Sequence, residues 1–66
     1  MDEDDELLDA LYAIDPADLD YLEWLQVGMA LHYEGYDWRV WDEWSRQDSN
    51  RYNEGECEEK WATFYE

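Results

Sequence analysis

The sequence predicts an all-α protein, a compact bundle of three to four short helices. Apolar residues recur at spacings of three, four and seven, which is the period of an amphipathic helix. Residues typical of helix starts and stops separate these runs, and no stretch shows the alternation of a half-buried strand. Because 66 residues make one domain at most, we expect a single helical domain over residues 1–66, with a partly frayed acidic start at residues 1–6.

The first helix is predicted from about residue 3 to residue 13. Acidic residues concentrate in its first turn, where the helix dipole favours negative charge. The pair Asp15-Pro16 then ends the helix, because the residue before a proline is pushed out of helical geometry. The apolar positions of this segment fall on one face: Leu7, Leu8, Leu11 and Ile14.

The second helix is predicted between Asp20 and Gly35. Asp20 is followed three residues later by Glu23, the spacing of a capping box, and Gly35 stands where a left-handed glycine ends a helix. Few positions between them are polar, so we expect a central helix that is wetted on only a narrow strip. Gly28 costs about 1 kcal/mol relative to alanine inside a helix, and we expect a tryptophan from another helix to lie over it.

A short third helix is predicted over residues 38–46. Asp37 can cap it, and Trp41 and Trp44 lie three residues apart on one face. The polar residues 47–52 that follow are expected to form a loop.

The fourth helix is predicted to begin after this loop and to run nearly to the end of the chain. Asn53 and Glu56 repeat the spacing of a capping box. Cys57, Trp61 and Phe64 follow at spacings of four and three, so they share a face. Together with the other tryptophans they supply the dense core that so short a chain needs, because each aromatic side chain can bury about 150 to 250 Å².

The charge of the chain argues against nucleic acid as its main partner. Twenty acidic residues stand against four basic ones, which gives a net charge of −16 that would repel a phosphate backbone. Residues 1–34 contain no Lys or Arg, so an anion-binding face would have to lie in the second half. The candidates for such a nucleic-acid contact are Arg39, Arg46, Arg51 and Lys60, interleaved with Tyr36, Trp38 and Tyr52. We favour local ion pairs for these cations.

The residue types that carry catalysis or bind metals do not form a recognisable motif. The acidic tract at residues 2–6 lacks the glycine and the distant glutamate of a calcium loop, and one cysteine with one histidine falls short of a zinc site. We expect His32 to be a partly exposed residue near a helix end and Cys57 to be a buried apolar residue rather than a reactive thiol. The sequence therefore predicts no enzyme, no cofactor and no metal.

Neighbouring carboxylates diverge around a helix and do not converge on a substrate. We therefore interpret the pairs Asp42-Glu43 and Glu58-Glu59 as solvated surface. A single cysteine gives no use for an oxidising compartment, and neither a positively charged leader nor a run of roughly 18 apolar residues occurs. We therefore expect a cytoplasmic protein with no membrane partner.

Three separated motifs, in order, resemble a known family. They are Trp24-Leu-Gln-Val-Gly28-Met-Ala-Leu31, Trp41-Asp-Glu-Trp44-Ser45 and Tyr52-Asn-Glu-Gly-Glu-Cys57-Glu-Glu-Lys60-Trp61-Ala-Thr-Phe64. The pattern resembles the primase C-terminal type 2 domain, a small helical module in replication proteins of phages, plasmids and integrated elements, often between primase and helicase domains. The positions that match the family signature are Trp24, Gly28, Leu31, Trp44, Ser45, Cys57 and Trp61.

The resemblance implies structural roles for these signature residues and no catalytic residue. The tryptophans are expected in the core, and the Ser45 hydroxyl is expected to satisfy backbone groups where the third helix ends. The leading hypothesis is a non-catalytic accessory module of a mobile-element DNA primase or primase-helicase, which acts through contacts with a protein partner or with neighbouring primase and helicase domains. The alternative is an independent small acidic phage-type protein that mimics DNA and inhibits a host protein with a basic cleft.

Overall fold

A computed structural model of the chain describes residues 3–64. In order, the elements are α1 (Glu3–Tyr12), a 3-10 turn η1 (Pro16–Asp18), α2 (Tyr21–Tyr33), α3 (Trp38–Ser45) and α4 (Glu56–Ala62). This part of the chain contains no strand, which confirms the all-α class and the short helices. Of the acidic start, residues 1 and 2 lie outside the described residues, and residues 3–6 form the first turn of α1. Within residues 3–64, no helix has both the length and the apolar character needed to cross a membrane.

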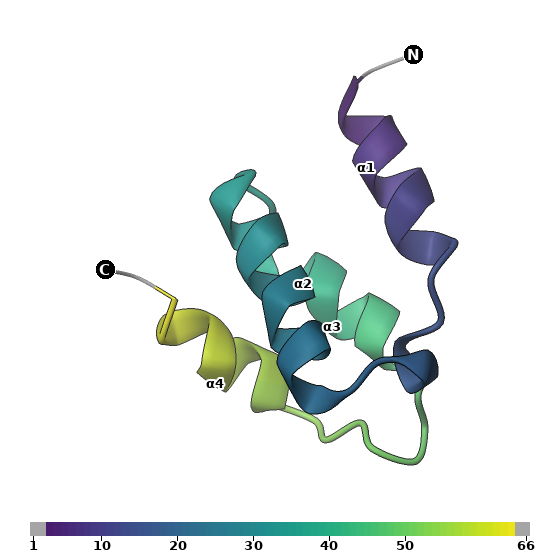
Figure 1. The fold of residues 1–66 in the computed structure, drawn as a ribbon. Helices are drawn as coiled ribbons and strands as arrows, with labels where there is room; N and C mark the ends of the chain where they lie inside the picture. Colours follow the sequence, from purple (N-terminus) through teal and green to yellow (C-terminus); the bar gives the residue numbers. More distant parts are fainter. Residues whose placement is uncertain (1–2, 65–66) are drawn as a thin grey trace.

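Three of the helices pack together, and the first stands apart from them. Figure 1 shows α2, α3 and α4 side by side, with α1 projecting from this group beyond η1. The end of α1 is nonetheless anchored, because Leu11 is buried in the core. The indole Nε1 of Trp44 also donates a hydrogen bond to the carbonyl oxygen of Ile14 at 3.0 Å. Helix α1 is therefore anchored at its C-terminal end, and Leu7 and Leu8 also pack against the core.

The core is aromatic, as the composition predicts. Trp41 and Trp44 have no exposed surface at all, and Trp61 is buried beside them. The buried hydrophobic residues form one cluster: Leu11, Leu31, Trp41, Trp44, Cys57 and Trp61. Because the cluster draws on all four helices, each helix contributes to the same core.

The ends of α2 follow the predicted capping chemistry. The Asp20 carboxylate accepts a hydrogen bond from the backbone N–H of Glu23 at 2.8 Å, and Glu23 accepts one from the backbone N–H of Asp20 at 3.0 Å. At the other end Gly35 has φ +92°. Its N–H bonds to the carbonyl of His32, and the N–H of Tyr36 bonds to that of Leu31, which is a complete Schellman motif.

The predicted start of the fourth helix is wrong. Asn53 and Glu56 form no capping box; α4 begins at Glu56 itself, without a side-chain cap. Gly55 precedes it with φ +90°, a conformation that glycine adopts without steric cost. The Asn53 amide instead donates to the carbonyl of Arg51 at 3.4 Å. The left-handed glycine therefore makes the corner that the sequence interpretation assigned to a cap.

The expectation that only a narrow strip of α2 is exposed to solvent is also wrong. Gly28 and Leu31 are its only buried residues, whereas Leu22 is 61% exposed and Tyr33 is 87% exposed. The physical reason is the arrangement of the bundle: α3 and α4 cover one side of α2, and α1 stands away from its other side (Figure 1). The apolar residues on that outer side remain in contact with solvent.

Candidate functional site

The residues that match the family signature come together in the interior. Trp24, Gly28 and Leu31 lie on α2, Trp44 and Ser45 lie on α3, and Cys57 and Trp61 lie on α4. All of them are buried except Trp24, which is half-buried and packs against the cluster. The three motifs therefore define where the three packed helices meet.

Gly28 allows Trp41 of α3 to lie directly against the backbone of α2. A Cβ atom added to it would lie 2.5 Å from two ring atoms of Trp41, which confirms that a tryptophan occupies the missing side chain's place. Trp41 in turn stacks on Trp24 with ring centroids 4.4 Å apart. Trp41 is not among the predicted signature positions, although a glycine inside a helix indicates such a close neighbour.

Ser45 bonds to side chains and not, as expected, to backbone groups at the end of α3. Its hydroxyl oxygen accepts a hydrogen bond from Trp24 Nε1 at 2.8 Å and lies 3.6 Å from Cys57 Sγ, which donates to it. At the end of α3 the Gln47 side-chain amide instead donates a hydrogen bond to the backbone carbonyl of Trp44 at 3.2 Å. Ser45 is only 4% exposed, so its hydroxyl faces the core and links three helices there.

Cys57 is buried, as predicted, and burial raises the pKa of its thiol to about 11. Since the ordinary value is 9.0, the reactive thiolate fraction at neutral pH falls about a hundredfold. We expect iodoacetamide to label the folded protein at least tenfold more slowly than the same chain in denaturant. Because Cys57 is the sole cysteine, mass spectrometry reports on this thiol alone. Equal rates in both states would contradict its burial.

Asp42 is buried, which corrects its interpretation as solvated surface. Only 8% of it is exposed, whereas Glu43, Glu58 and Glu59 are exposed as predicted. The Asp42 carboxylate accepts a hydrogen bond from the Tyr52 hydroxyl at 2.7 Å and one from Arg46 Nε at 3.2 Å. Tyr52, ten residues further along the chain, supplies a partner that no local pattern indicates.

The bond from Tyr52 to Asp42 should make stability depend on alkaline pH. Asp42 accepts a hydrogen bond from the phenolic O–H, which together with burial raises the Tyr52 pKa from 10.0 to about 12. The folded state therefore favours protonated Tyr52. Its contribution is fully present below pH 10 and is lost as the pH rises to about 12. We expect Tyr52→Phe to cost about 1 to 2 kcal/mol in urea unfolding at neutral pH, and the difference from wild type to vanish at high pH. A pH-independent difference would contradict this role.

The candidate nucleic-acid contacts are engaged within the chain. Arg39 pairs with Asp37 at 2.9 Å, Arg46 with Asp42 at 3.2 Å and Arg51 with Asp48 at 2.6 Å. The expected local ion pairs are therefore present for the three arginines. Two of the arginines also cover aromatic rings with their guanidinium carbons: Arg39 lies 5.2 Å from the Trp38 centroid, and Arg46 lies 4.8 Å from the Tyr52 centroid. Lys60 lies on α4 and lines a groove beside α2.

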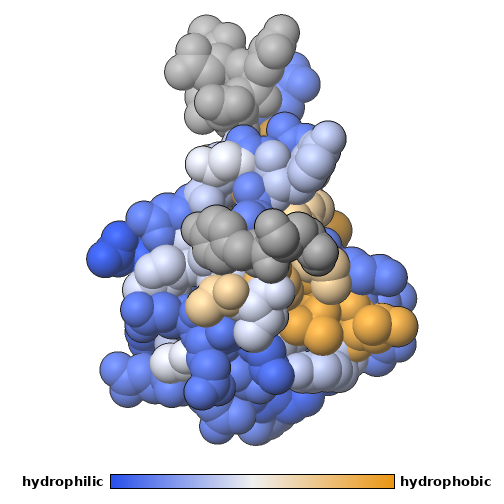
Figure 2. Space-filling view, turned by 90° about the vertical axis from the view of Figure 1, so that its left-hand side faces the viewer, coloured by the Kyte–Doolittle hydropathy of each residue, from blue (hydrophilic) through white to orange (hydrophobic). Residues whose placement is uncertain are grey.

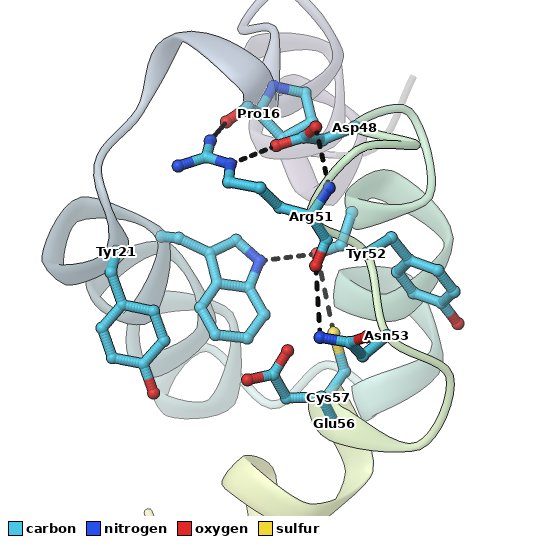
Figure 3. Close-up of a pocket in the computed structure, with 10 residues that line it drawn as sticks. Pro16, Tyr21, Asp48, Arg51, Tyr52, Asn53, Glu56 and Cys57 are labelled. Carbon is cyan, nitrogen blue, oxygen red and sulfur yellow. Dashed lines mark hydrogen bonds and ion pairs between the residues drawn. The ribbon is translucent and has the colours of Figure 1, made fainter.

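Arg51 fastens the turn between α1 and α2 to the loop after α3. Its Nη2 donates to the carbonyl oxygens of Pro16 at 2.9 Å and Leu19 at 2.7 Å, while its Nε donates to Asp48 (Figure 3). Asp48 is 7% exposed, and the hydrogen bond from Arg51 lowers the pKa of its carboxyl group. Pro16, Asp48 and Arg51 line a cavity of about 60 Å³ together with Cys57 and Tyr52; Figure 3 draws these side chains.

The arrangement around Arg51 predicts unequal effects for two arginine substitutions. Arg51→Ala removes the guanidinium, which donates to the carbonyls of Pro16 and Leu19 and to the buried carboxylate of Asp48, so we expect the midpoint of thermal unfolding to fall by several degrees. Arg39→Ala removes an ion pair whose side chains are 73% and 52% exposed, and we expect almost no change. Circular dichroism melting curves compare the two. Equal midpoints for both variants would show that the Arg51 contacts do not stabilise the fold.

His32 is held among aromatic side chains. His32 packs edge-on against Trp61 and Phe64, with ring centroids 5.0 and 5.9 Å away. Among residues 3–64, no group of three His, Cys, Asp or Glu side chains is placed to hold a metal ion. The structure thus brings the signature residues together as a packed core, and it separates the arginines among different carboxylates.

The outer side of α2 carries the largest exposed apolar side chains of the three packed helices. They are Leu22, Met29 and Tyr33. Beside them Leu25, Met29 and Tyr33 face Lys60 of α4 and Phe64, just after α4, across a groove of about 640 Å³. Figure 2 shows the side of the molecule where α4 ends, with a large orange area and smaller, paler patches in a mainly blue surface.

The comparisons with known proteins give one match. No curated protein and no solved structure matches the chain. The family model described as Primase C terminal 2 (PriCT-2) matches residues 7–66, which include every signature position located above in the core. This match confirms the family that the three motifs indicate. The chain therefore belongs to the primase C-terminal 2 family.

Proposed function

We propose that this chain is a non-catalytic accessory module of a mobile-element DNA primase or primase-helicase. Its family implies a primase-associated role in DNA replication. The finer proposal is that the module binds protein, and that it positions neighbouring primase or helicase domains on the template. The observation that carries this proposal is the distribution of side chains. The signature residues pack in the core, while a large apolar surface on α2 faces solvent.

The chemistry of the buried groups supports a role other than catalysis. Ser45 and Cys57 are 4% and 1% exposed, so a substrate has no access to either nucleophile in this arrangement. The pKa of Cys57 is raised, which is the opposite of what an activated thiol requires. His32 packs against aromatic rings, not against a nucleophile. These residues act as parts of the fold.

The electrostatics support a protein partner over direct contact with DNA. The three arginines that could meet a phosphate backbone already pair with carboxylates, and the chain as a whole carries −16. Binding to nucleic acid would have to break those pairs and overcome the remaining repulsion. Binding to an apolar or basic protein surface requires neither the loss of these ion pairs nor the approach of a phosphate backbone.

A reconstituted priming assay tests the proposal. The purified chain is added to the primase catalytic domain encoded at the same replication locus, on a single-stranded template. We expect no primer synthesis by the chain alone and increased synthesis when both are present. Primer synthesis by the chain alone would make it an enzyme, and unchanged synthesis in the mixture would exclude the accessory role. Fluorescence anisotropy with labelled single-stranded DNA at low salt is the companion measurement, and micromolar binding would contradict the protein-contact mode.

A second candidate function rests on the charge of −16. An independent acidic protein could present carboxylates in place of phosphates and occupy the basic cleft of a host protein. Such binding should weaken steeply as salt rises, because it depends on exposed charges. Binding that persists in high salt would instead favour the apolar surface of α2 and the accessory function.

A further inference from the structure

Helix α2 is apolar on two opposite sides. Its inner side carries Trp24, Gly28 and Leu31, which pack against α3 and α4. Leu22, Met29 and Tyr33 follow each other at spacings of seven and four, which places them together on the outer side. They are 61%, 46% and 87% exposed. A helix that is apolar all round is ordinarily buried all round, and this one is covered on one side within the described residues.

The outer side of α2 has the dimensions of a site for another helix. From Leu22 to Tyr33 the helix rises by about 16 Å, at about 1.5 Å per residue, which is three turns. Leu25 and Met29 continue this surface into the groove of about 640 Å³, whose other wall includes Phe64, two residues after the end of α4. The stem of Lys60 adds apolar surface to the same wall. Amphipathic helices bind such grooves through apolar anchors spaced three, four and seven residues apart.

The negative charge of the chain favours a basic partner helix over a second copy of the chain. A second copy would bring a charge of −16 against −16, so self-association through this face is opposed by repulsion. The acidic residues that flank the face on α2, Glu23 and Glu34, are exposed. A partner with Lys and Arg beside its apolar anchors gains both from apolar burial and from these carboxylates.

We propose that the outer side of α2 and the groove beside α4 bind a basic amphipathic helix of a partner protein. This inference rests on the proposed accessory function and names the surface and the chemistry of its contact. The partner's apolar residues cover Leu22, Met29 and Tyr33, and its basic residues lie near Glu23 and Glu34. Binding completes the burial of a helix that the chain by itself covers on one side.

An NMR titration tests the site. The isotope-labelled chain is titrated with a synthetic helical peptide of about 15 residues that has Leu on one face and Lys and Arg on the other. A peptide of the same composition in shuffled order is the control for charge alone. We expect chemical-shift changes along residues 22–33 and at Lys60, and binding at least tenfold weaker for the shuffled peptide. Shift changes elsewhere, equal affinity of the two peptides or no binding of the amphipathic peptide would overturn the proposal.

A pair of matched double variants tests the apolar anchors without changing the charge. Leu22→Gln with Met29→Gln removes two exposed anchors of α2, and we expect peptide affinity to fall at least tenfold. Tyr12→Gln with Ile14→Gln removes two apolar side chains that are 49% and 42% exposed outside α2, and affinity should stay unchanged. Thermal melting verifies that both variants fold. Wild-type affinity in the first variant would contradict the site.

Two further measurements separate this proposal from its alternatives. Sedimentation equilibrium reports self-association, and a dimer that the Leu22→Gln and Met29→Gln variant abolishes would assign the face to a second copy. In the priming assay, full stimulation by this variant would exclude the docking site and leave the accessory function intact. Intact peptide binding without any stimulation of priming by the wild-type chain would exclude the accessory function and leave the docking site standing.

Discussion

Trp44→Ala is expected to unfold most of the protein at room temperature. The Trp44 side chain is completely buried, and truncating such a residue costs about 3 to 5 kcal/mol. The substitution also removes the indole donor to the carbonyl of Ile14, which ties the end of α1 to α3. A chain of this length has roughly 3 to 10 kcal/mol of stability in total, so one substitution consumes much or all of it.

Urea unfolding followed by far-ultraviolet circular dichroism measures this effect. Trp38→Ala is the matched control, because it removes the same side chain from a partly buried position on the same helix. We expect a clearly smaller loss for Trp38→Ala, and a loss close to that of Trp44→Ala for Trp61→Ala, since Trp61 is 7% exposed. Cooperative unfolding of Trp44→Ala at the wild-type midpoint would show that this tryptophan is not part of the core.

Gly28→Ala is expected to destabilise the protein although alanine favours helices. The added methyl group would lie 2.5 Å from Cε2 and Cζ2 of Trp41, closer than carbon atoms can approach. Trp41 cannot turn aside easily, because Trp24 stacks on it at 4.4 Å and it has no exposed surface. Overpacking of this kind costs about 1 to 3 kcal/mol or more, and the gain in helix propensity offsets about 1 kcal/mol of it. Because the 2.5 Å approach is severe, we expect a cost near the upper end of this range and a net loss of about 1 to 2 kcal/mol.

A double-mutant cycle distinguishes this clash from a general effect of alanine. Trp41→Phe removes ring atoms next to Gly28, so Gly28→Ala should cost less in a Trp41→Phe background than in the wild type. Gln26→Ala, at an exposed position of the same helix, should leave the unfolding free energy nearly unchanged. If Gly28→Ala were neutral or stabilising, the close approach of α2 and α3 at this residue would be wrong.

The sequence predicted those features that depend on short spacings. The capping box of Asp20 and Glu23 and the left-handed Gly35 were both predicted, because their partners lie within a few residues. The buried tryptophans and Cys57 follow from helical periodicity, and the neighbour of Gly28 follows from the cost of glycine inside a helix. The family was also readable from the ordered motifs.

The candidate site was predicted in part. The signature residues were expected in the core and are found there, but the Ser45 hydroxyl bonds to Trp24 and Cys57 instead of the backbone. Asp42 was assigned to the surface because its neighbour Glu43 diverges from it around the helix, and that argument does not say which of the two faces inward. The incorrect capping box at Asn53 shows the same limit, since Gly55 between the two residues allows a different corner.

By itself, the sequence determined the helices, most of their ends, the aromatic core, the excess of negative charge and the family. Only the tertiary structure decided which polar groups are buried and which apolar groups are exposed. Asp42 meets Tyr52, and Arg51 reaches the carbonyl of Pro16, across segments whose relative position no local pattern specifies. The outer side of α2 is exposed for the same reason. The sequence pattern indicates that α2 is apolar, but the positions of α1, α3 and α4 decide which of its sides is buried.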